Sequence, residues 1–298
     1  MKKNLFLIGN GFDIAHGLPT KFNPDFKIIA QANESIPYIW DLYQTRNSDI
    51  WSDFENSLAY PDFNELQEIF DSYSPDYSSD RESDRNSIII QAIISGNLQK
   101  TLYEFATKAE NEIKKRSPIP MFENWFNPCS FFINFNYTHT LEIIYEIHED
   151  HILHIHGEVG VNDLILGYPD GEFNPEMYFY DIRMRGRQSS SIDIIDYIDS
   201  LDDYYVKVAF KTLYEKVKGF SKHTNINLIN NFINTKEIDE IIVIGHAYKT
   251  DFKYYEWLKK RFPLVKWTMY YYNNEDKIAA SNLAENLRID YGLKQFKS

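Results

Sequence analysis

Short apolar runs that end at a glycine or a polar residue recur along this chain. The runs at 5–8 and 241–244 show no alternation of apolar and polar positions, which is typical of strands in a parallel sheet covered on both faces. Similar runs and a β-prone composition predict further strands at 131–135, 152–155, 164–166 and 267–272.

Segments with helical spacing of apolar residues lie between these runs. Residues 88–115 show that spacing and end before Pro118, and residues 139–148 and 277–291 are also predicted to be helices. Helices that alternate with strands ending in glycine or a polar residue predict an α/β fold with a doubly wound, mostly parallel sheet.

Two polar segments, 71–87 and 169–203, are predicted to be irregular, because they hold few apolar residues or several Pro, Gly and Ser. We interpret them as loops or insertions on a common core. The chain is therefore predicted to be a single α/β domain over residues 1–298, with helical insertions at about 40–120 and 169–235.

Candidate functional residues are those that directly follow the predicted strands, because ligands of doubly wound sheets bind beyond the carboxyl ends of the strands. The residues selected on this basis are Gly9, Asn10, Gly11, Phe12, Asp13, Asn136, His156, Gly245, His246 and Asp251.

The first of these segments is a glycine loop. Gly9 and Gly11 allow the backbone to turn sharply and to approach a phosphate, although Gly17 lies too far along for the dinucleotide fingerprint. Without a ligand the same loop would be a tight strand-to-helix turn with Asp13 as a cap. With a ligand, Asp13 would accept a hydrogen bond from a ribose or an amide. Both interpretations stay open.

Histidines gather around the strand predicted at 152–155. His154 and His156 would share one face of a strand, with His139, His148 and His151 near in sequence. They could form a metal site, be core histidines, or comprise one acid–base residue and a structural neighbour. We place a general base at His156, since an imidazole at a strand end titrates near neutral pH, and assign no metal ligand.

Polar residues at two other strand ends complete the candidates. Asn136 lies at the mouth of an apolar strand, where its amide can hold a water or a hydroxyl without carrying charge. Gly245 permits close approach of the backbone. His246 and Asp251 would contact a ligand or cap the next helix.

Composition and charge exclude several classes of protein. With 31 Lys+Arg against 44 Asp+Glu, the net charge of −13 argues against a nucleic-acid partner. Cys129 is the only cysteine, which excludes an intramolecular disulfide and any zinc site that needs two thiolates. No apolar stretch approaches the roughly 20 residues that span a bilayer, and Asn10 interrupts the apolar start before a signal peptide could form. We expect a cytoplasmic protein without a membrane partner.

The segment Gly9–Thr20 closely resembles the N-terminal signature of the AbiH family of bacteriophage abortive-infection proteins. The resemblance continues at 135–138, at 155–157 and at 244–246 with Asp251. It implies a bacterial protein that limits phage spread at the expense of the infected cell, and with it a phage-encoded trigger.

The order of these motifs is also similar to that of the sirtuin superfamily. This similarity implies a Rossmann-like fold, NAD as substrate or ligand, and assembly into a homo-oligomer. It implies that Asn136 positions water and that His156 is the base. It further implies that Gly9, Asn10 and Gly11 line the phosphates, and that Gly245 and His246 approach the adenosine ribose. Deacetylation is excluded, because one cysteine cannot build the four-cysteine zinc ribbon of sirtuin deacetylases.

Three hypotheses of function follow. The first is anti-phage defence by cleavage of the N-glycosidic bond of NAD. The second is a non-catalytic module that senses a nucleotide ligand such as ADP-ribose. The third is a metal-dependent phosphohydrolase or nuclease built on the histidines with Asp13 and Asp251.

Overall fold

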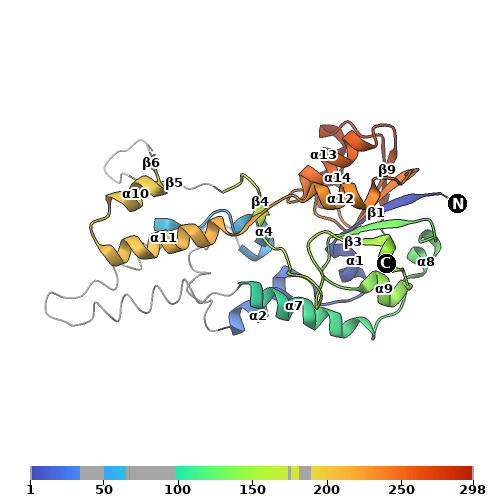
Figure 1. The fold of residues 1–298 in the computed structure, drawn as a ribbon, viewed down its shortest axis with the longest axis horizontal. Coiled ribbons are helices and arrows are strands. Elements are labelled where there is room, and N and C mark those ends of the chain that lie inside the picture. Colours follow the sequence, from blue (N-terminus) through green and yellow to red (C-terminus); the bar gives the residue numbers. More distant parts are fainter. Residues whose placement is uncertain are drawn as a thin grey trace. The chain divides into compact units, whose positions relative to one another are not determined.

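A six-stranded, all-parallel sheet is the main feature of the computed structural model (Figure 1). From one edge to the other its strands are β3 (Ile152–His154), β2 (Phe131–Asn134), β1 (Asn4–Ile8), β8 (Glu240–Ile244), β9 (Lys266–Tyr271) and β10 (Tyr291–Gln295). In chain order this is the 3-2-1-4-5-6 arrangement of Rossmann-type sheets, with its switch point between β1 and β8. The predicted α/β, Rossmann-like fold class is confirmed.

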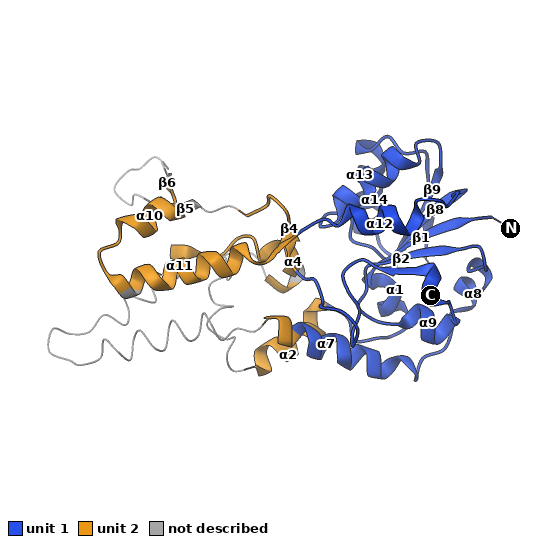
Figure 2. Cartoon of the chain, in the orientation of Figure 1, with its two compact units in different colours: residues 1–21, 102–166, 223–298 blue, residues 22–101, 167–222 orange. Residues whose placement is uncertain are grey.

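The structure describes residues 2–33, 50–64, 67, 98–173, 176–180 and 189–296. The chain divides into two compact units (Figure 2). Unit 1 contains the sheet and comprises residues 1–21, 102–166 and 223–298, and unit 2 comprises residues 22–101 and 167–222. The single-domain interpretation with two insertions stays a prediction.

Both faces of the sheet are buried, which explains the unbroken apolar runs. Leu5 and Leu7 of β1 belong to one hydrophobic core, and Phe6 and Ile8 belong to a second core on the opposite face. Side chains of α12 (Ile226–Ile233), α13 (Phe252–Arg261) and α14 (Asn274–Asn286) pack in the first core. Side chains of α1 (Asn10–Ala15), α8 (Pro120–Trp125) and α9 (Thr140–Tyr145) pack in the second. Successive residues of a strand point to opposite faces, so a strand covered on both sides must be apolar throughout.

The predicted strands at 5–8, 131–135, 152–155, 241–244 and 267–272 are confirmed within a residue or two at their ends. The strand predicted at 164–166 is wrong. The N–H of Ile165 in that run donates to the carbonyl of His156 at 2.9 Å, so the run packs on the loop after β3 instead of joining the sheet.

The predicted helices are confirmed in part. α7 (Leu98–Ile113) is the described part of the helix predicted at 88–115, and α9 lies within the helix predicted at 139–148. A further short helix, η3 (Glu149–His151), precedes β3. The last predicted helix is wrong beyond Asn286, because the chain takes a positive φ of 52° at Arg288 and then forms β10.

Unit 2 contains short helices and two small sheets. β4 (Tyr168–Pro169) pairs in parallel with β7 (Ser221–Lys222), and β5 (Glu176–Tyr180) pairs antiparallel with β6 (Ser189–Asp193). Among the residues described, the helices that lie wholly within this unit are η1 (Phe22–Phe26), α2 (Lys27–Ala32), η2 (Ile50–Ser52), α4 (Phe54–Ser57), α10 (Ile194–Ser200) and α11 (Tyr204–Lys218). The prediction of an irregular segment at 169–203 is therefore wrong for β5, β6 and α10, whereas residues 71–87 lie outside the described residues.

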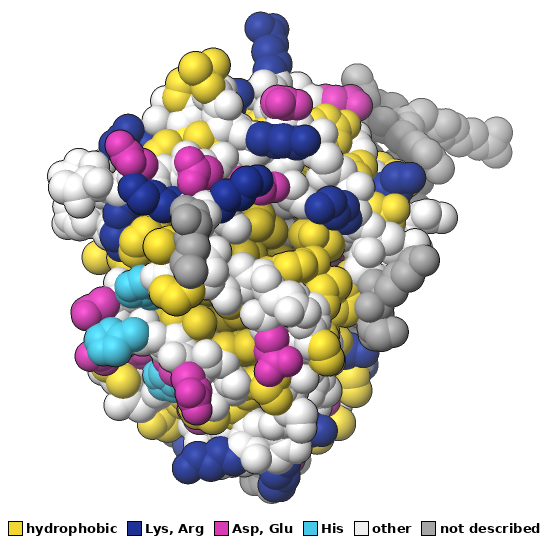
Figure 3. Space-filling model, turned by 90° about the vertical axis from the view of Figure 1, so that its right-hand side faces the viewer, with side chains coloured by type: hydrophobic (Ala, Val, Ile, Leu, Met, Phe, Trp, Pro, Cys, Tyr) yellow, Lys and Arg dark blue, Asp and Glu magenta, His cyan; other side chains and the backbone are white. Residues whose placement is uncertain are grey.

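Charged side chains of both signs are interspersed on the face shown in Figure 3. Lys and Arg stand among Asp and Glu there and form no continuous basic surface. In the part of the chain that the structure describes, no helix is both long and apolar enough to cross a membrane.

Candidate functional site

The carboxyl ends of β1 and β8 meet backbone to backbone at the switch point. The N–H of Gly9 donates to the carbonyl of Ile244 at 3.0 Å, and the N–H of Gly11 donates to that of Gly245 at 2.7 Å. A Cβ added to Gly11 would lie 2.6 Å from the Cα of Gly245, and Gly245 itself has a positive φ of 61°. The contact between the two loops by itself requires glycine at these positions.

The same contact occupies the N–H groups that were predicted to face a phosphate. Those of Gly9 and Gly11 are bonded across the switch point, and that of Phe12 donates to the carbonyl of Gly9 at 2.9 Å. Asn10 donates its side-chain amide to the carbonyl of Thr20 at 2.6 Å. The turn between β1 and α1 thus accounts for the two glycines, and the phosphate-binding role of the loop stays a prediction.

A buried histidine–carboxylate line lies beside this loop. Asp251 accepts a hydrogen bond from Nε2 of His156 at 3.0 Å and one from Nε2 of His246 at 3.1 Å. The side chain of His156 is only 4% exposed, and those of Asp251 and His246 are each 5% exposed. Nδ1 of His246 is bonded to the hydroxyl of Tyr255. The ring of Phe135 packs against both imidazoles, with its centroid 5.4 Å from that of His156 and 3.9 Å from that of His246. The structure therefore brings together predicted residues that lie 95 positions apart in sequence.

The carboxylate of Asp251 does not act as a helix cap. Asp251 occupies the N-cap position of α13, yet its side chain makes no capping hydrogen bond and bonds the two histidines instead. A carboxylate between two imidazoles fixes their tautomers and stabilises whichever ring takes up a proton.

Asn136 joins the ends of β1 and β2. Its Nδ2 donates to the carbonyl of Gly9 at 3.2 Å, and its backbone N–H donates to Oδ1 of Asn134 at 3.1 Å. The predicted amide therefore touches the glycine loop. Asn134, which is 1% exposed, was not predicted as a site residue. It is the last residue of β2, and the candidates were chosen among the residues that follow a strand.

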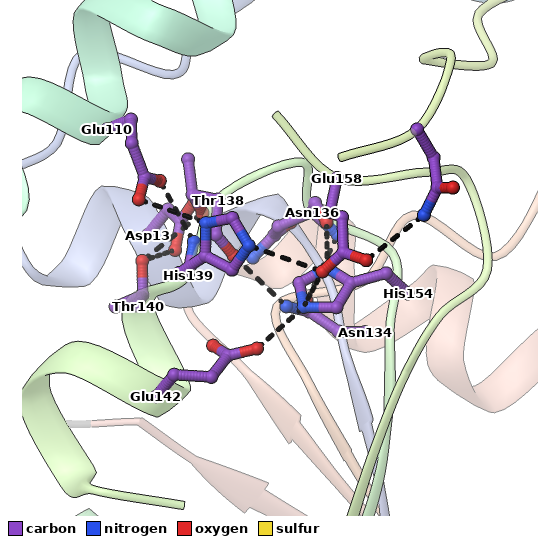
Figure 4. A network of polar contacts seen from close by, with 11 residues as sticks. Asp13, Glu110, Asn134, Asn136, Thr138, His139, Thr140, Glu142, His154 and Glu158 are labelled. Carbon is purple, nitrogen blue, oxygen red and sulfur yellow. Dashed lines mark hydrogen bonds and ion pairs between the residues drawn. The ribbon is translucent and has the colours of Figure 1, made fainter. Parts of the chain in front are cut away.

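The carboxylate of Asp13 faces the hydroxyl groups of two threonines (Figure 4). Its carboxylate accepts hydrogen bonds from Oγ1 of Thr138 at 2.5 Å and Oγ1 of Thr140 at 2.8 Å. Burial raises the pKa of Asp13 from its ordinary 3.8 to about 6, against the two hydroxyl donors, which lower it.

This pKa predicts a dependence of stability on pH. Folding raises the pKa of this acid, so the folded state binds the proton more tightly than the unfolded chain does. The resulting stabilisation is complete at pH values below the pKa in the unfolded chain, and it is lost as the pH rises through the pKa in the folded state. The charges of Glu110 and His154, which act on Asp13 in opposite directions, are included in the raised pKa. A shift of about two units corresponds to roughly 3 kcal/mol. We expect urea titrations to show that the free energy of unfolding falls by up to that amount, relative to Asp13→Asn, between pH 4 and pH 7. Equal pH profiles of the wild type and the variant would contradict the prediction.

A third group of residues lies next to Asn136 and is built on two histidines (Figure 4). Nδ1 of His139 is bonded to Oε1 of Glu110 at 3.0 Å, and its Nε2 to Oε2 of Glu158 at 3.2 Å. Nε2 of His154 is bonded to Oε1 of Glu142 at 2.8 Å. The hydrogen bond to Glu110 raises the pKa of His139 to about 9, so this ring donates to both carboxylates at neutral pH.

The five histidines that are close in sequence separate in space. His154 is the last residue of β3 and lies with His139, whereas His156 lies beyond the strand and bonds Asp251. His148 is 71% exposed, and Nδ1 of His151 is bonded to the carbonyl of Ser130. The sequence reasoning missed Glu110, Glu142 and Glu158. The available signals were two spacings, Glu142 three positions after His139 and Glu158 four positions after His154.

The comparison with family models decides the family of this chain. The model described as Bacteriophage abortive infection AbiH matches residues 5–271. The chain belongs to the AbiH family. Its place in that family puts it among proteins of anti-phage defence by abortive infection. The AbiH match runs from β1 to the end of β9 and includes the glycine loop, Asn136 and both histidine groups. No curated protein and no solved structure matches the chain significantly.

Proposed function

We propose that this AbiH-family chain acts in abortive infection by hydrolysing the N-glycosidic bond of NAD at the carboxyl edge of its sheet. The observation that carries the proposal is the buried line of His156, Asp251 and His246 beside the switch point. Doubly wound sheets with this strand order bind dinucleotides in that place. The amide of Asn136, in contact with Gly9, lies at the same edge.

The chemistry suits residues of this kind. NAD and water give nicotinamide, ADP-ribose and a proton. The bond from the ribose C1′ to the nicotinamide nitrogen breaks, its electron pair leaves with nicotinamide, and water adds to C1′. Because the ribose becomes oxocarbenium-like, the protein has to position groups and stabilise charge more than to supply a strong nucleophile.

In this proposal Asn136 positions the water and His156 takes up a proton from a ribose hydroxyl or from the water. With Nε2–H of His156 donated to Asp251, Nδ1 is the basic nitrogen of the neutral ring. Asp251 then stabilises the imidazolium that forms. His246 completes the line and shares the charge of the same carboxylate.

The residues present fit the ribose half of NAD better than its pyrophosphate. The N–H groups of Gly9, Gly11 and Phe12 are already bonded to carbonyl oxygens, so the proposal assigns them no phosphate. It depends on the acid–base residues and on Asn136 alone.

The test follows NAD during infection, when a phage-encoded trigger is present. Bacteria that express the chain should lose NAD and accumulate nicotinamide and ADP-ribose within one infection cycle, measured by mass spectrometry of cell extracts. Cells without the chain, and cells with the exposed His148→Ala variant, supply the controls. Restriction of phage growth with unchanged NAD would contradict cleavage and would favour the nucleotide-sensing alternative.

A further inference from the structure

We propose that His139, His154 and Glu158 form a binding site for one divalent transition-metal cation of the zinc type. The site goes beyond the proposed NAD chemistry and does not depend on it. One ligand atom from each residue lies within 4.8 Å of those of the other two, and all three side chains are partly or largely buried.

The donor atoms have the spacing that a metal ion needs. Nε2 of His139 lies 3.2 Å from Oε2 of Glu158, and Nε2 of His154 lies 3.7 Å from the same oxygen. Ligand atoms around a tetrahedral zinc ion are about 3.3 Å apart, given metal–ligand distances near 2.0–2.1 Å. The two distances to Glu158 are therefore within about half an ångström of those around zinc, and the three ligand atoms lie within 4.8 Å of one another.

The opposite nitrogens of both rings are held as they are in metal-binding histidines, and a bound ion would replace the proton that Nε2 of His139 donates to Glu158 in the metal-free chain. Nδ1 of His139 is bonded to the carboxylate of Glu110, and Nδ1 of His154 lies 3.2 Å from the backbone carbonyl of Asn136. Metal-bound histidines usually donate their other N–H to a carboxylate or a backbone carbonyl, which orients the ring. The remaining oxygen of Glu158 accepts a hydrogen bond from Asn162 at 3.0 Å.

Glu142 is an independent indication that a cation binds here. Its Oε1 lies 2.8 Å from Nε2 of His154. Its Oε2 is buried, and nothing in the described part of the chain donates a hydrogen bond to it. A buried carboxylate oxygen without a donor is costly, and a cation bound beside it would remove that cost. Glu142 does not belong to the group of ligand atoms within 4.8 Å of one another, so we assign it the role of a negative charge beside the ion and not of a ligand.

The chemistry of the ligands selects the class of metal. Two imidazoles and one carboxylate favour zinc and related transition metals, whereas magnesium prefers oxygen ligands and keeps several waters. Because His154 is bonded to the carbonyl of Asn136, a bound ion would also fix the end of β2.

The experiment uses the purified full chain, freed of metal by a chelator and then titrated with zinc chloride in a calorimeter. We expect one equivalent to bind to the wild type, and Glu158→Gln and His139→Ala to weaken binding by at least about 100-fold. Glu110→Gln, which only loses the orienting carboxylate, should weaken it by about 10- to 100-fold. The matched control His148→Ala removes an exposed imidazole and should bind zinc as the wild type does.

Cobalt and thermal unfolding provide readouts that do not depend on heat of binding. Cobalt should give visible absorption bands with the wild type and not with Glu158→Gln. Zinc should raise the melting temperature of the wild type alone, since a ligand stabilises the state that binds it. Circular dichroism of the metal-free variants checks that they fold. Failure of the wild type to bind zinc, or equal binding by the Glu158→Gln, His139→Ala and control variants, would overturn the proposal.

Discussion

Replacing Gly245 by alanine is expected to lower the free energy of unfolding by about 3 kcal/mol or more. Gly245 has a positive φ of 61°, a conformation that costs an L-residue with a side chain roughly 1–2 kcal/mol. A new Cβ would also lie 2.6 Å from backbone atoms of Gly11 and Phe12, and backbone cannot give way as a flexible side chain can. Relief of that overlap means separating the ends of β1 and β8, where the central strands meet.

Gly160→Ala is the matched control for this prediction. Gly160 has a positive φ of 82°, but no atom lies within 4 Å of the position that its Cβ would occupy. It should therefore show the conformational cost alone, about 1 kcal/mol. Urea denaturation followed by circular dichroism gives both values. Equal losses in the two variants would show that the packing between the two loops contributes nothing to stability.

Patterns within single segments were enough to predict five of the six strands of the sheet. A strand buried on both faces has no polar side, so the runs at 5–8 and 241–244 indicated a parallel sheet directly. β10 was missed for a physical reason. It lies at the edge of the sheet, its residues are half-buried or exposed, and it begins Tyr-Gly, so neither periodicity nor propensity distinguishes it from the end of the preceding helix.

The candidate site shows what such patterns cannot supply. Chain position after a strand identified His156, His246 and Asp251, and the parallel topology brings these residues together. The partner of each side chain depends on rotamers and on the turn after β3, where Gly157 has a φ of 83°. In the structure His156 bonds Asp251 and His154 bonds Glu142, so two histidines that are one residue apart in sequence belong to different groups.

The glycine loop illustrates the same limit in another way. Glycine permits close approach, but the sequence does not say of what. In the structure the neighbour of Gly11 is the backbone of Gly245, so one pattern fits both a phosphate loop and a contact between two protein loops. The functional proposal therefore rests on the buried carboxylate that bonds two imidazoles and not on the glycines.

Removing His156 should have the largest effect on that function. If His156 is the base, His156→Ala should slow release of nicotinamide by roughly 10²–10⁴-fold. Asn136→Ala should also impair release, because the amide that positions water is lost. In the wild type, Nε2 of His156 and Nε2 of His246 both donate to the carboxylate of Asp251. Asp251→Asn keeps the size of this side chain but replaces one of its two acceptor oxygens by an NH₂ donor. One of the rings must then change its tautomer or lose its partner, so this variant should resemble His156→Ala in rate while binding NAD with similar affinity.

The side chains of His156, Asn136 and Asp251 are buried, so their replacement could also disturb the fold. The experiment must therefore distinguish a loss of catalysis from a loss of packing. His151→Ala is the control, since His151 is a half-buried imidazole that precedes β3 at the opposite end of the strand. Each variant is compared by circular dichroism, by NAD binding in a calorimeter and by nicotinamide release. Variants that fold and bind NAD but release no nicotinamide support an acid–base role for the line. Undiminished release by both His156→Ala and Asn136→Ala would reject the assignment, because the proposed reaction would then proceed without the groups that hold its water and its proton.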